Sequence, residues 1–489
     1  MSNHWRGKGR GRYQSSRPFY PKKTTDISSV PAPPLGTLIQ SLAKHDLDND
    51  AEAYLDSARI QDCELVASYN WLDKSDPAMI IPGRPPRWTP LPGENKLPQD
   101  SGDYFRDKNA ARYPAHLMEA TVLAALSLRP DLRAADVDVV ACYSSLGNLV
   151  RFVLGRDKSF RILVQAMGNS VFFVRRENSP TEKIEGIRGH GHTFPEAYTT
   201  WDPEVRGSDT SHRILKYRFG GLRMLVRAEA DAYVAGEGDE SPSLSSRAAE
   251  KESASATSPT RAKDIALLNT LMSSLSPTSN ASPPSSTPPT KISINTNPAT
   301  GVTPVSQSQI LEIKTRGIWK KDKEDMIAEE MPKLWLAQVP NFMVAYHDRG
   351  TFEADIKVQD VKLRVDRWEK MAKRDLAALA ALLHRLIGLV RERAAGSIEL
   401  CRTGMGELEV REWGGDVGEV VSEETKGRWV GGGVQITGSA AGVWKEEEAQ
   451  PDAGDGGVEL NVGVDGEWEG DKDWTHCSAE CGYCGGCRK

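Results

Sequence analysis

Leu222-Arg223-Met224-Leu225-Val226-Arg227-Ala228-Glu229-Ala230-Asp231 alternates apolar with charged side chains, and Leu311-Glu312-Ile313-Lys314-Thr315 repeats the pattern further along the chain. This period of two predicts β-strands with one charged face. Residues i and i+2 of a strand point the same way, so Glu229 is expected beside Asp231 and Glu312 beside Lys314. If the two strands are neighbours, three carboxylates and one ammonium converge.

The segment between these strands, residues 235–307, is rich in Ser, Thr and Pro. It cannot bury enough apolar area to offset chain entropy, so we expect a disordered insertion. Such an insertion fits at the tip of a hairpin joining the two strands, because doubling a loop costs only about 0.6 kcal/mol. Separation in sequence therefore does not argue against a shared site.

Composition predicts one large domain with tails. The chain has 489 residues and a net charge of −6, but the charge is uneven. Residues 1–23 carry seven Lys or Arg and no acid, whereas residues 402–475 carry eighteen Asp or Glu against six Lys or Arg. The expected division is a basic Arg/Gly-rich disordered tail (1–35), one folded domain (36–234 and 308–411), the insertion (235–307), an acidic Gly-rich disordered region (412–475) and a Cys-rich tail (476–489).

Neither a secretory signal nor a membrane span is expected. The N-terminus lacks an apolar stretch, and the longest apolar run, Leu376–Val390, contains His384 and Arg385 and is too short to cross a bilayer. We expect an intracellular protein, nuclear or cytoplasmic or both, with no membrane partner. Cys63, Cys142 and Cys401 are far apart in sequence and indicate no disulfide framework.

The remaining pattern predicts an α/β or α+β fold with a mixed central β-sheet flanked by helices. Apolar residues at helical spacing predict a long amphipathic helix over residues 366–395, with Met371 in the core and Gly396 ending it. The other expected elements are helices at 114–128 and 139–153, a hairpin of 161–166 and 170–175 around Gly168-Asn169, a helix after Lys314 and a strand at 342–346.

The charged residues suit metal-assisted cleavage of a phosphodiester or pyrophosphate. Mg²⁺ or Mn²⁺ prefers oxygen ligands, which would come from Asp231, Glu312 and the main-chain carbonyl of Ile313, with Glu229 on a second ion or a bridging water. Lys314 would orient the attacking water or hold a phosphate oxygen. Each motif alone is more often solvated charge, but together they lie in strongly apolar strands, where like charges are costly without a counter-ion.

The order of these motifs resembles the PD-(D/E)XK nucleases, and the flanking sequence resembles their DXO-type decapping exoribonuclease branch. The resemblance covers about residues 60 to 365. Four blocks carry it: Val139–Leu149 with the hairpin ending Val171–Val174; Gly191-His192-Thr193-Phe194-Pro195-Glu196-Ala197-Tyr198; Arg227–Asp231 with Glu312–Thr315; and Lys333-Leu334-Trp335-Leu336-Ala337-Gln338-Val339-Pro340-Asn341-Phe342.

The resemblance implies a metal-dependent enzyme of RNA 5′-end processing, of the decapping or 5′-to-3′ exonuclease type. It makes Glu196, with Glu229, Asp231 and Glu312, the acidic cluster, Lys314 the catalytic lysine, and Gln338 a helper near the site. Arg227 is a further candidate for substrate contact. Leu146 stands where the family has a phosphate-gripping Arg, and Arg151 could substitute for it. Without that Arg, the alternative is a non-catalytic binding module that keeps the nuclease fold.

The whole chain also resembles fungal proteins labelled geranylgeranyl pyrophosphate synthetase. Prenyl diphosphate synthases bind diphosphate through paired Asp-Asp-x-x-Asp motifs on helices, and this sequence has none. Asp46, Asp48 and Asp50 alternate in a short acidic stretch instead. The motifs therefore do not support this third function.

Smaller signals leave several alternatives open. Cys477, Cys481, Cys484 and Cys487 have spacing that fits Zn²⁺, or part of an iron–sulfur site, but equally a redox-active tail or a protein-binding knuckle. The basic N-terminal tail suits either a nucleic-acid backbone, with RNA the expected partner, or solubility alone. Trp201, Trp319 and Trp335 could stack on bases, although buried packing is the expected role of each.

Overall fold

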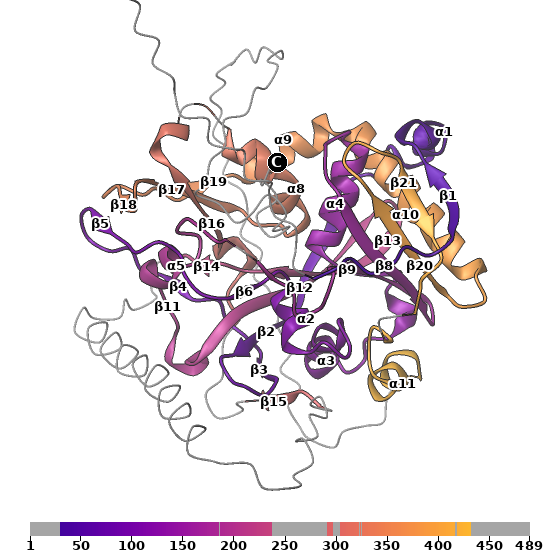
Figure 1. Cartoon of the computed structure of the whole chain (residues 1–489), viewed down its shortest axis with the longest axis horizontal. Coiled ribbons are helices and arrows are strands. Elements are labelled where there is room, and N and C mark those ends of the chain that lie inside the picture. Colours follow the sequence, from indigo (N-terminus) through magenta and orange to yellow (C-terminus); the bar gives the residue numbers. More distant parts are fainter. Residues whose placement is uncertain are drawn as a thin grey trace, which may run out of the picture.

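The computed structural model describes residues 30–184, 186–236, 291–296, 304–321, 323, 325–415 and 418–431. Within these residues, the strands form an eleven-stranded sheet, an eight-stranded sheet and a small two-stranded ribbon. Helices cover the sheets (Figure 1), and both parallel and antiparallel pairs occur. The expected α/β fold with a mixed central sheet is confirmed.

The sheets have the following strands, in spatial order. The first sheet runs β1 (Leu38–Leu42), β21 (Leu408–Arg411), β20 (Ser397–Arg402), β8 (Phe160–Met167), β9 (Ser170–Arg176), β7 (Val139–Cys142), β13 (Leu222–Glu229), β12 (Ser208–Phe219), β2 (Gln61–Leu72), β3 (Ala78–Ile81) and β15 (Ser293–Thr296). The second runs β11 (Thr199–Thr200), β4 (Arg87–Trp88), β14 (Ala232–Tyr233), β16 (Ile310–Gly317), β17 (Asn341–Asp348), β18 (Thr351–Phe352) and β5 (Asn95–Lys96), with β19 (Gln359–Asp360) also beside β17. The ribbon pairs β6 (Tyr104–Phe105) with β10 (Lys183–Ile184).

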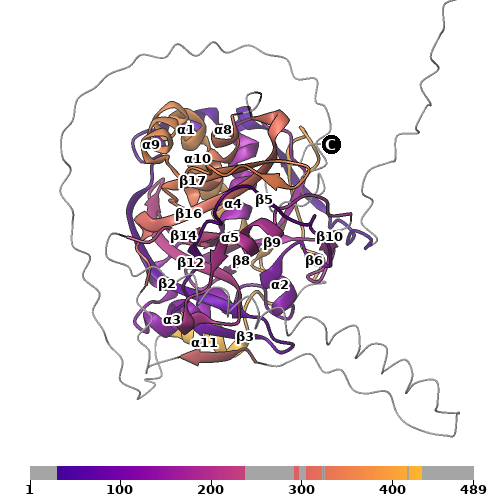
Figure 2. The same ribbon diagram turned by 90° about the vertical axis from the view of Figure 1, so that its left-hand side faces the viewer.

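The described α-helices lie on opposite sides of the sheets. They are α1 (Asp48–Ala51), α2 (Lys108–Arg112), α3 (Glu119–Leu128), α4 (Tyr143–Val153), α5 (Thr193–Tyr198), α8 (Met326–Leu336), α9 (Lys362–Met371), α10 (Lys373–Glu392) and α11 (Glu423–Gly431). Figure 2 shows α1, α8, α9 and α10 grouped at one side and α3 and α11 at the other.

The centre of the first sheet is buried on both faces. In β7, Val139 and Ala141 pack in the cluster that contains α4 and α10, whereas Val140 packs in the cluster that contains α3 and α11. A continuous apolar run suits such a strand, which pairs in parallel with both neighbours. The predicted helix over 139–153 is therefore wrong for its first four residues, and α4 begins at Tyr143.

Other predicted elements are confirmed with changed limits. β8 and β9 form the expected hairpin, and Gly168 in its turn has a φ of +58°, which glycine adopts without strain. The helix expected over 366–395 is instead two helices, α9 and α10, which meet at Ala372. Met371, expected in the core, is 80% exposed because it lies at this break.

Several expectations concern residues outside the described ones: the basic tail up to residue 29, most of the insertion, and the Cys-rich tail. Two described stretches differ from the expected disorder. Residues 293–296 form β15, which pairs in parallel with β3. Residues 423–431 form α11, where buried Trp429 packs in the same cluster as α3. Single apolar residues in polar sequence, Ile292 just before β15 and Trp429 in α11, are buried in the same core cluster.

The described cysteines, Cys63, Cys142 and Cys401, form no disulfide with one another, as expected. None of the helices in the described ranges is both long and apolar enough to span a bilayer.

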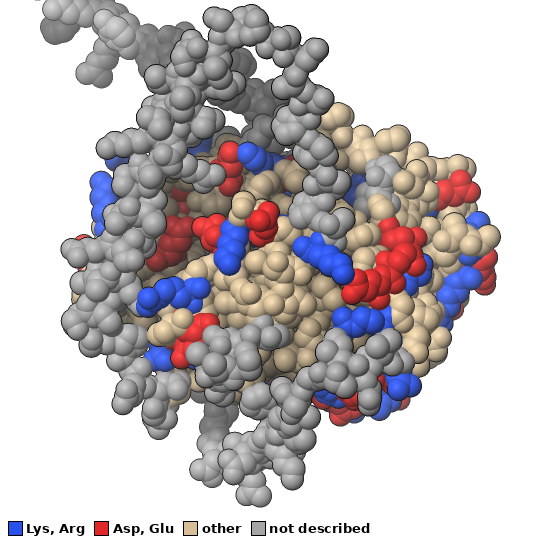
Figure 3. Space-filling model, turned by 90° about the horizontal axis from the view of Figure 1, so that it is seen from below, with Lys and Arg blue, Asp and Glu red and all other residues tan. Residues whose placement is uncertain are grey.

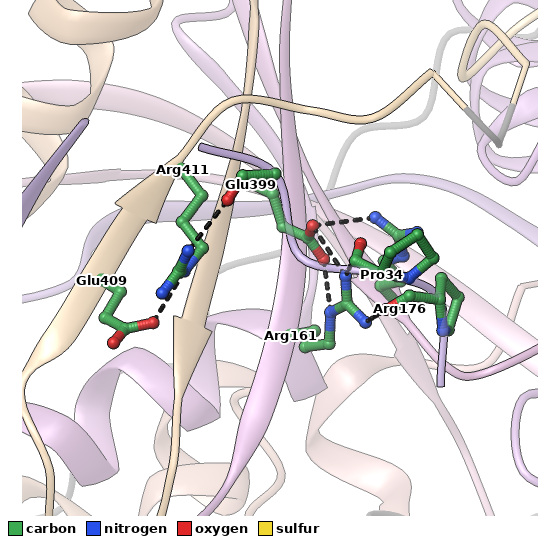
Figure 4. A network of polar contacts seen from close by, with 8 residues as sticks. Pro34, Arg161, Arg176, Glu399, Glu409 and Arg411 are labelled. Carbon is green, nitrogen blue, oxygen red and sulfur yellow. Dashed lines mark hydrogen bonds and ion pairs between the residues drawn. The ribbon is translucent and has the colours of Figure 1, made fainter. Parts of the chain in front are cut away.

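A buried carboxylate fastens the N-terminal segment to the first sheet (Figure 4). Glu399 on β20 receives hydrogen bonds from Arg161 on β8 at 2.6 and 2.8 Å and lies 2.9 Å from a guanidinium nitrogen of Arg176 on β9. Arg161 also donates to the main-chain carbonyls of Pro33 and Pro34 at 2.5 and 3.3 Å. This network joins three strands to the start of the described chain.

Candidate functional site

The two charged stretches meet where the first sheet gives way to the second. β13 ends at Glu229. After two intervening residues the chain enters β14, which is the antiparallel neighbour of β16. The register places Ala232 opposite Leu311, and the Asp231 carboxylate accepts a hydrogen bond from the Ile313 N–H at 2.9 Å. The predicted convergence of Asp231 with the Glu312 stretch is present.

β16 separates apolar from charged side chains by its period of two. Leu311 and Ile313 pack in a cluster with residues of α5, β17 and β18. Glu312 and Lys314, on the alternate positions, contact α8. All eight residues of β16 are buried, so the charged residues need partners within the protein.

Helix α8 supplies those partners from one of its faces, because positions i, i+4 and i+7 of a helix lie on one side. Met326, Glu330 and Lys333 have this spacing. The Nζ of Lys314 lies 2.8 Å from Glu312 and 3.7 Å from Glu330, and Lys333 donates a hydrogen bond to Glu312. We call Glu312, Lys314, Arg316, Glu330 and Lys333 the charge row; Arg316 contacts the Met326 sulfur at 3.2 Å.

Burial and neighbouring charge shift the pKa values of the acids in and beside this row. Burial raises the pKa of Asp231 to about 7, and the negative charge of Glu312 adds to the rise. Burial also raises the pKa of Glu330 above its ordinary value. Burial alone would raise the pKa of Glu312 too, but Lys314 and Lys333 lower it below its ordinary value. Asp231 is therefore a carboxylate suited to exchanging protons near neutral pH.

The lysines of the row stay protonated. Burial alone would lower the pKa of Lys314, yet the charges of Glu312 and Glu330 raise it above its ordinary value. Burial likewise opposes the charge of Lys333, and Glu312 raises its pKa well above that of a free lysine. Two fixed ammonium groups therefore lie against one carboxylate.

Sequence reasoning missed Glu330, Lys333, Tyr143 and Lys108. The Lys333 ammonium lies 5.2 Å from the ring centre of Tyr143, the first residue of α4, and burial raises the pKa of that phenol to about 12. Glu330 and Lys333 have the i, i+3 spacing of one helix face, but Glu329 beside them is also acidic, so the pattern alone does not select them. Lys333 and Tyr143 lie in sequence segments that resemble the decapping family, but no role was expected for either. Nothing in the sequence distinguishes Lys108 from other lysines.

The other two predicted acids, Glu229 and Glu196, are influenced by Lys108 on α2. The Glu229 carboxylate is 4.0 Å from the Nζ of Lys108 on α2. Glu196 on α5 is exposed as a residue, but its carboxylate is partly buried. This burial and the charge of Asp100 raise its pKa, while Lys108 opposes the rise. The four predicted acids thus form two groups, with Lys108 acting on Glu229 and Glu196.

The predicted substrate-contacting residues are also placed. Arg227 is buried, 3.4 Å from the hydroxyl of Thr121 on α3, and Arg151 is half-buried near the Asn148 side chain at 3.5 Å. The Gln338 amide donates to the Trp335 carbonyl at 2.6 Å, which closes the end of α8. Leu146, in the family's Arg position, is a core residue of α4. The substrate roles of these residues stay predictions.

The tryptophans differ in burial. Trp335 is buried as expected, and Trp201 is partly buried. Trp319 is 45% exposed, so the expectation of buried packing is wrong for it. It lies just after β16, where the chain turns away from the sheet.

The predicted metal ligands do not fit a divalent ion as they are placed. In the described part of the chain, no three His, Cys, Asp or Glu side chains are grouped closely enough to hold a metal. Around Asp231, three carboxylates (Asp231, Glu312, Glu330) face three cations (Lys314, Arg316, Lys333), so formal charges cancel. Oxygen ligands with surplus negative charge are what Mg²⁺ and Mn²⁺ select.

Comparison with known proteins places the chain in a family. No curated protein matches the sequence. Solved structures that match include three from yeasts: Rai1 of Scheffersomyces stipitis with (3′-NADP)⁺ and calcium ion (11% identity, TM-score 0.46, 80% of this chain and 98% of that one), Rai1 of Candida albicans with pU5-Mn²⁺ (10%, 0.42, 76% and 97%), and Dxo1 of K. lactis with manganese (10%, 0.38, 80% and 97%).

Rai1 and Dxo1 are proteins of the decapping type that the motifs resemble, although identity and TM-score are both low. The activity of this chain is therefore inferred from its own residues. A family model described as a domain of unknown function, DUF8563, matches residues 42–402, and the chain belongs to that family.

Proposed function

We propose that this chain binds the 5′ end of RNA and hydrolyses a phosphodiester or pyrophosphate bond there. The observation that supports this best is that Asp231, in the turn between β13 and β14, meets β16, which carries Glu312 and Lys314. A carboxylate with a pKa near 7 beside two ammonium groups has the components for proton transfer and for phosphate charge. The choice of RNA 5′ ends follows the decapping-type motifs of the sequence.

In this proposal the lysines stabilise charge and Asp231 moves a proton. An ammonium carries three N–H donors, so Lys314 and Lys333 can contact Glu312 and still donate to a phosphoryl oxygen. Asp231 accepts a proton from the attacking water, whose oxygen forms the new bond to phosphorus as the bond to the leaving oxygen breaks. Glu312 positions both lysines. Mg²⁺ or Mn²⁺, predicted from sequence, takes no part in these steps.

Trp319 and its lysine neighbours support a nucleic-acid partner. The Nζ atoms of Lys320 and Lys323 lie 5.2 and 5.8 Å from the ring centre of Trp319, and that of Lys321 lies 5.4 Å from the ring centre of Tyr346. We call Trp319, Lys320, Lys321 and Lys323 the aromatic–lysine turn. Exposed aromatic rings stack on bases, and lysines beside them attract the phosphate backbone. Lys321 also pairs with Glu353 at 2.8 Å, so Lys320 and Lys323 are the better candidates for phosphate contact. On the face drawn in Figure 3, acidic and basic groups are interspersed.

The test is hydrolysis of 5′-labelled RNA by the full chain. Substrates carrying a 5′ monophosphate, triphosphate or cap are compared in EDTA, Mg²⁺ and Mn²⁺, which also tests the predicted cofactor. We expect product from the wild type and strong losses in Glu312→Gln and Lys314→Met. Lys44→Met, which removes an exposed pair with Asp375, is the surface control. Undiminished turnover in both site variants would reject the site.

A non-catalytic RNA-binding module is the second candidate. Two observations favour it. Leu146 is a core residue at the position where the DXO-type decapping family has an Arg, and the formal charges at the site cancel. This candidate predicts that fluorescently labelled 5′-phosphorylated RNA binds the chain but is never cleaved under any of the three conditions. Cleavage that Lys314→Met abolishes would exclude it.

A further inference from the structure

Lys333 occupies the position that a metal would need at Glu312. The Glu312 side chain is only 1% exposed, and both ammonium groups contact the same carboxylate oxygen, Oε1. Lys314 is 2.8 Å from that oxygen, and Lys333 donates a hydrogen bond to it. A metal-binding carboxylate directs such an oxygen to its ion. At Glu312 the cations are instead the ammonium groups of two lysine side chains.

The placement pairs two alternate residues of β16 with two residues about one turn apart on α8. Residues two apart on β16 are about 6.6 Å apart, and residues three apart on α8 rise about 4.5 Å along the helix axis. Glu312 and Lys314 each meet a residue of opposite charge, Lys333 and Glu330 respectively. Every contact is between opposite signs, so the arrangement is complementary along its length and does not depend on one chance approach.

Because these side chains are buried, replacing the Lys333 ammonium at Glu312 by a metal ion is unfavourable. The side chains of Glu330 and Lys333 are 3% and 6% exposed, so solvent screens their charges little. An ion entering at Glu312 would have to displace the Lys333 ammonium into an interior that already holds Lys314 and Arg316. An unpaired ammonium in the protein interior is unfavourable, which opposes the exchange.

We propose that the Lys333 ammonium takes the place of a divalent cation at Glu312, so that Asp231 and Glu312 bind no Mg²⁺ or Mn²⁺ while Lys333 is present. The inference rests on the proposed function only for the choice of ions to compare. It predicts that removing the ammonium creates a metal site: Asp231 and Glu312 would then lie together with one cation fewer.

The experiment titrates the full chain with Mn²⁺ alone and measures bound ion by calorimetry and electron paramagnetic resonance. Lys333→Met keeps the length and apolar stem of the side chain and removes its charge. We expect it to gain one saturable site, at least tenfold tighter than any Glu312-dependent binding in the wild type. Adding Glu312→Gln to Lys333→Met should remove that gain and corrects for binding elsewhere in the chain.

Arg161→Met is the matched control, because it also removes one of two cations from a buried carboxylate, Glu399. A gain there equal to that of Lys333→Met would overturn the proposal, since any uncovered carboxylate would then suffice. A folded Lys333→Met that gains nothing would overturn it as well. If Lys333→Met does not fold, the wild type decides: Mn²⁺ binding lost in Glu312→Gln contradicts the proposal, and equal binding supports it. RNA turnover enters none of these readouts.

Discussion

Glu399 and Glu312 are both buried carboxylates held by two cations, yet their surroundings differ. At Glu399, Arg161 contacts both carboxylate oxygens and Arg176 lies against one of them, and Arg161 also binds the N-terminal segment. At Glu312, two lysines contact one oxygen, with Glu330 close by and Asp231 near enough for its pKa to respond to Glu312. A planar guanidinium fork fixes structure, whereas each lysine ammonium at Glu312 has three N–H donors, so it can hold the carboxylate and still donate to a substrate.

The largest effect is expected at the structural carboxylate. Glu399→Ala leaves Arg161 and Arg176 buried without their counter-charge, so the free energy of unfolding should fall by about 3–5 kcal/mol. Urea unfolding followed by circular dichroism measures this change. Turnover per folded molecule should stay at the wild-type value. A stable Glu399→Ala would show that these ion pairs contribute little and that the two carboxylates do not differ in this way.

Lys314→Met, unlike Glu399→Ala, is expected to change turnover. It should lower kcat for RNA cleavage by about 10²- to 10³-fold, because a donor to the phosphoryl oxygens is lost. Arg316→Met, from the same strand face, is the matched comparison. It removes a cation that contacts Thr315 and Met326 and should lower kcat far less. Equal losses in both variants would mean that the whole charge row, and not Lys314 in particular, supports activity.

The aromatic–lysine turn should contribute to RNA affinity and not to the chemical step. Trp319→Ala removes an exposed stacking surface and should weaken binding of single-stranded RNA by about 1–3 kcal/mol, with kcat unchanged. Fluorescence polarisation measures the Kd. Because the chain has 12 Trp, stacking on Trp319 is reported by the part of the RNA-induced quenching that is lost in Trp319→Ala. Trp201→Phe, at a partly buried tryptophan, is the control. Unchanged affinity in Trp319→Ala would place the RNA elsewhere.

The expected hairpin of two long charged strands is wrong, because β13 pairs with β7 and β12 and only the short β14 pairs with β16. The strand period predicted that Glu312 and Lys314 share a face of β16, but Asp231 lies between β13 and β14, outside any strand. The period could not predict Lys333 and Glu330, since their contact with β16 depends on how α8 packs, which no local pattern encodes. The same limit explains β7. The apolar run Val139–Cys142 suits a strand or a helix equally, and only burial between two helix layers selects the strand.

The smallest expected effect is a pH dependence of stability at Asp231. Its pKa rises from 3.8 to about 7 on folding, so the native state holds the proton more tightly than the unfolded chain does. This stabilising contribution is complete below pH 4 and is lost as pH rises to about 7. Asp231→Asn stays neutral throughout and has no such loss. Relative to this variant, the wild type should lose on the order of 1 kcal/mol between pH 4 and 8, a figure reduced for partial exposure of the carboxylate.

Urea unfolding of both proteins at several pH values in EDTA measures the difference. Glu312→Gln sharpens it, because the negative charge of Glu312 contributes to the rise in the Asp231 pKa. In that background the loss of stability should begin at the same pH, set by the unfolded chain, and end at a lower pH. A wild type that gains stability relative to Asp231→Asn as pH rises would mean that the lysines, and not burial and Glu312, dominate at Asp231. Its carboxylate would then be a fixed anion like Glu399 and unsuited to accept the proton of the attacking water.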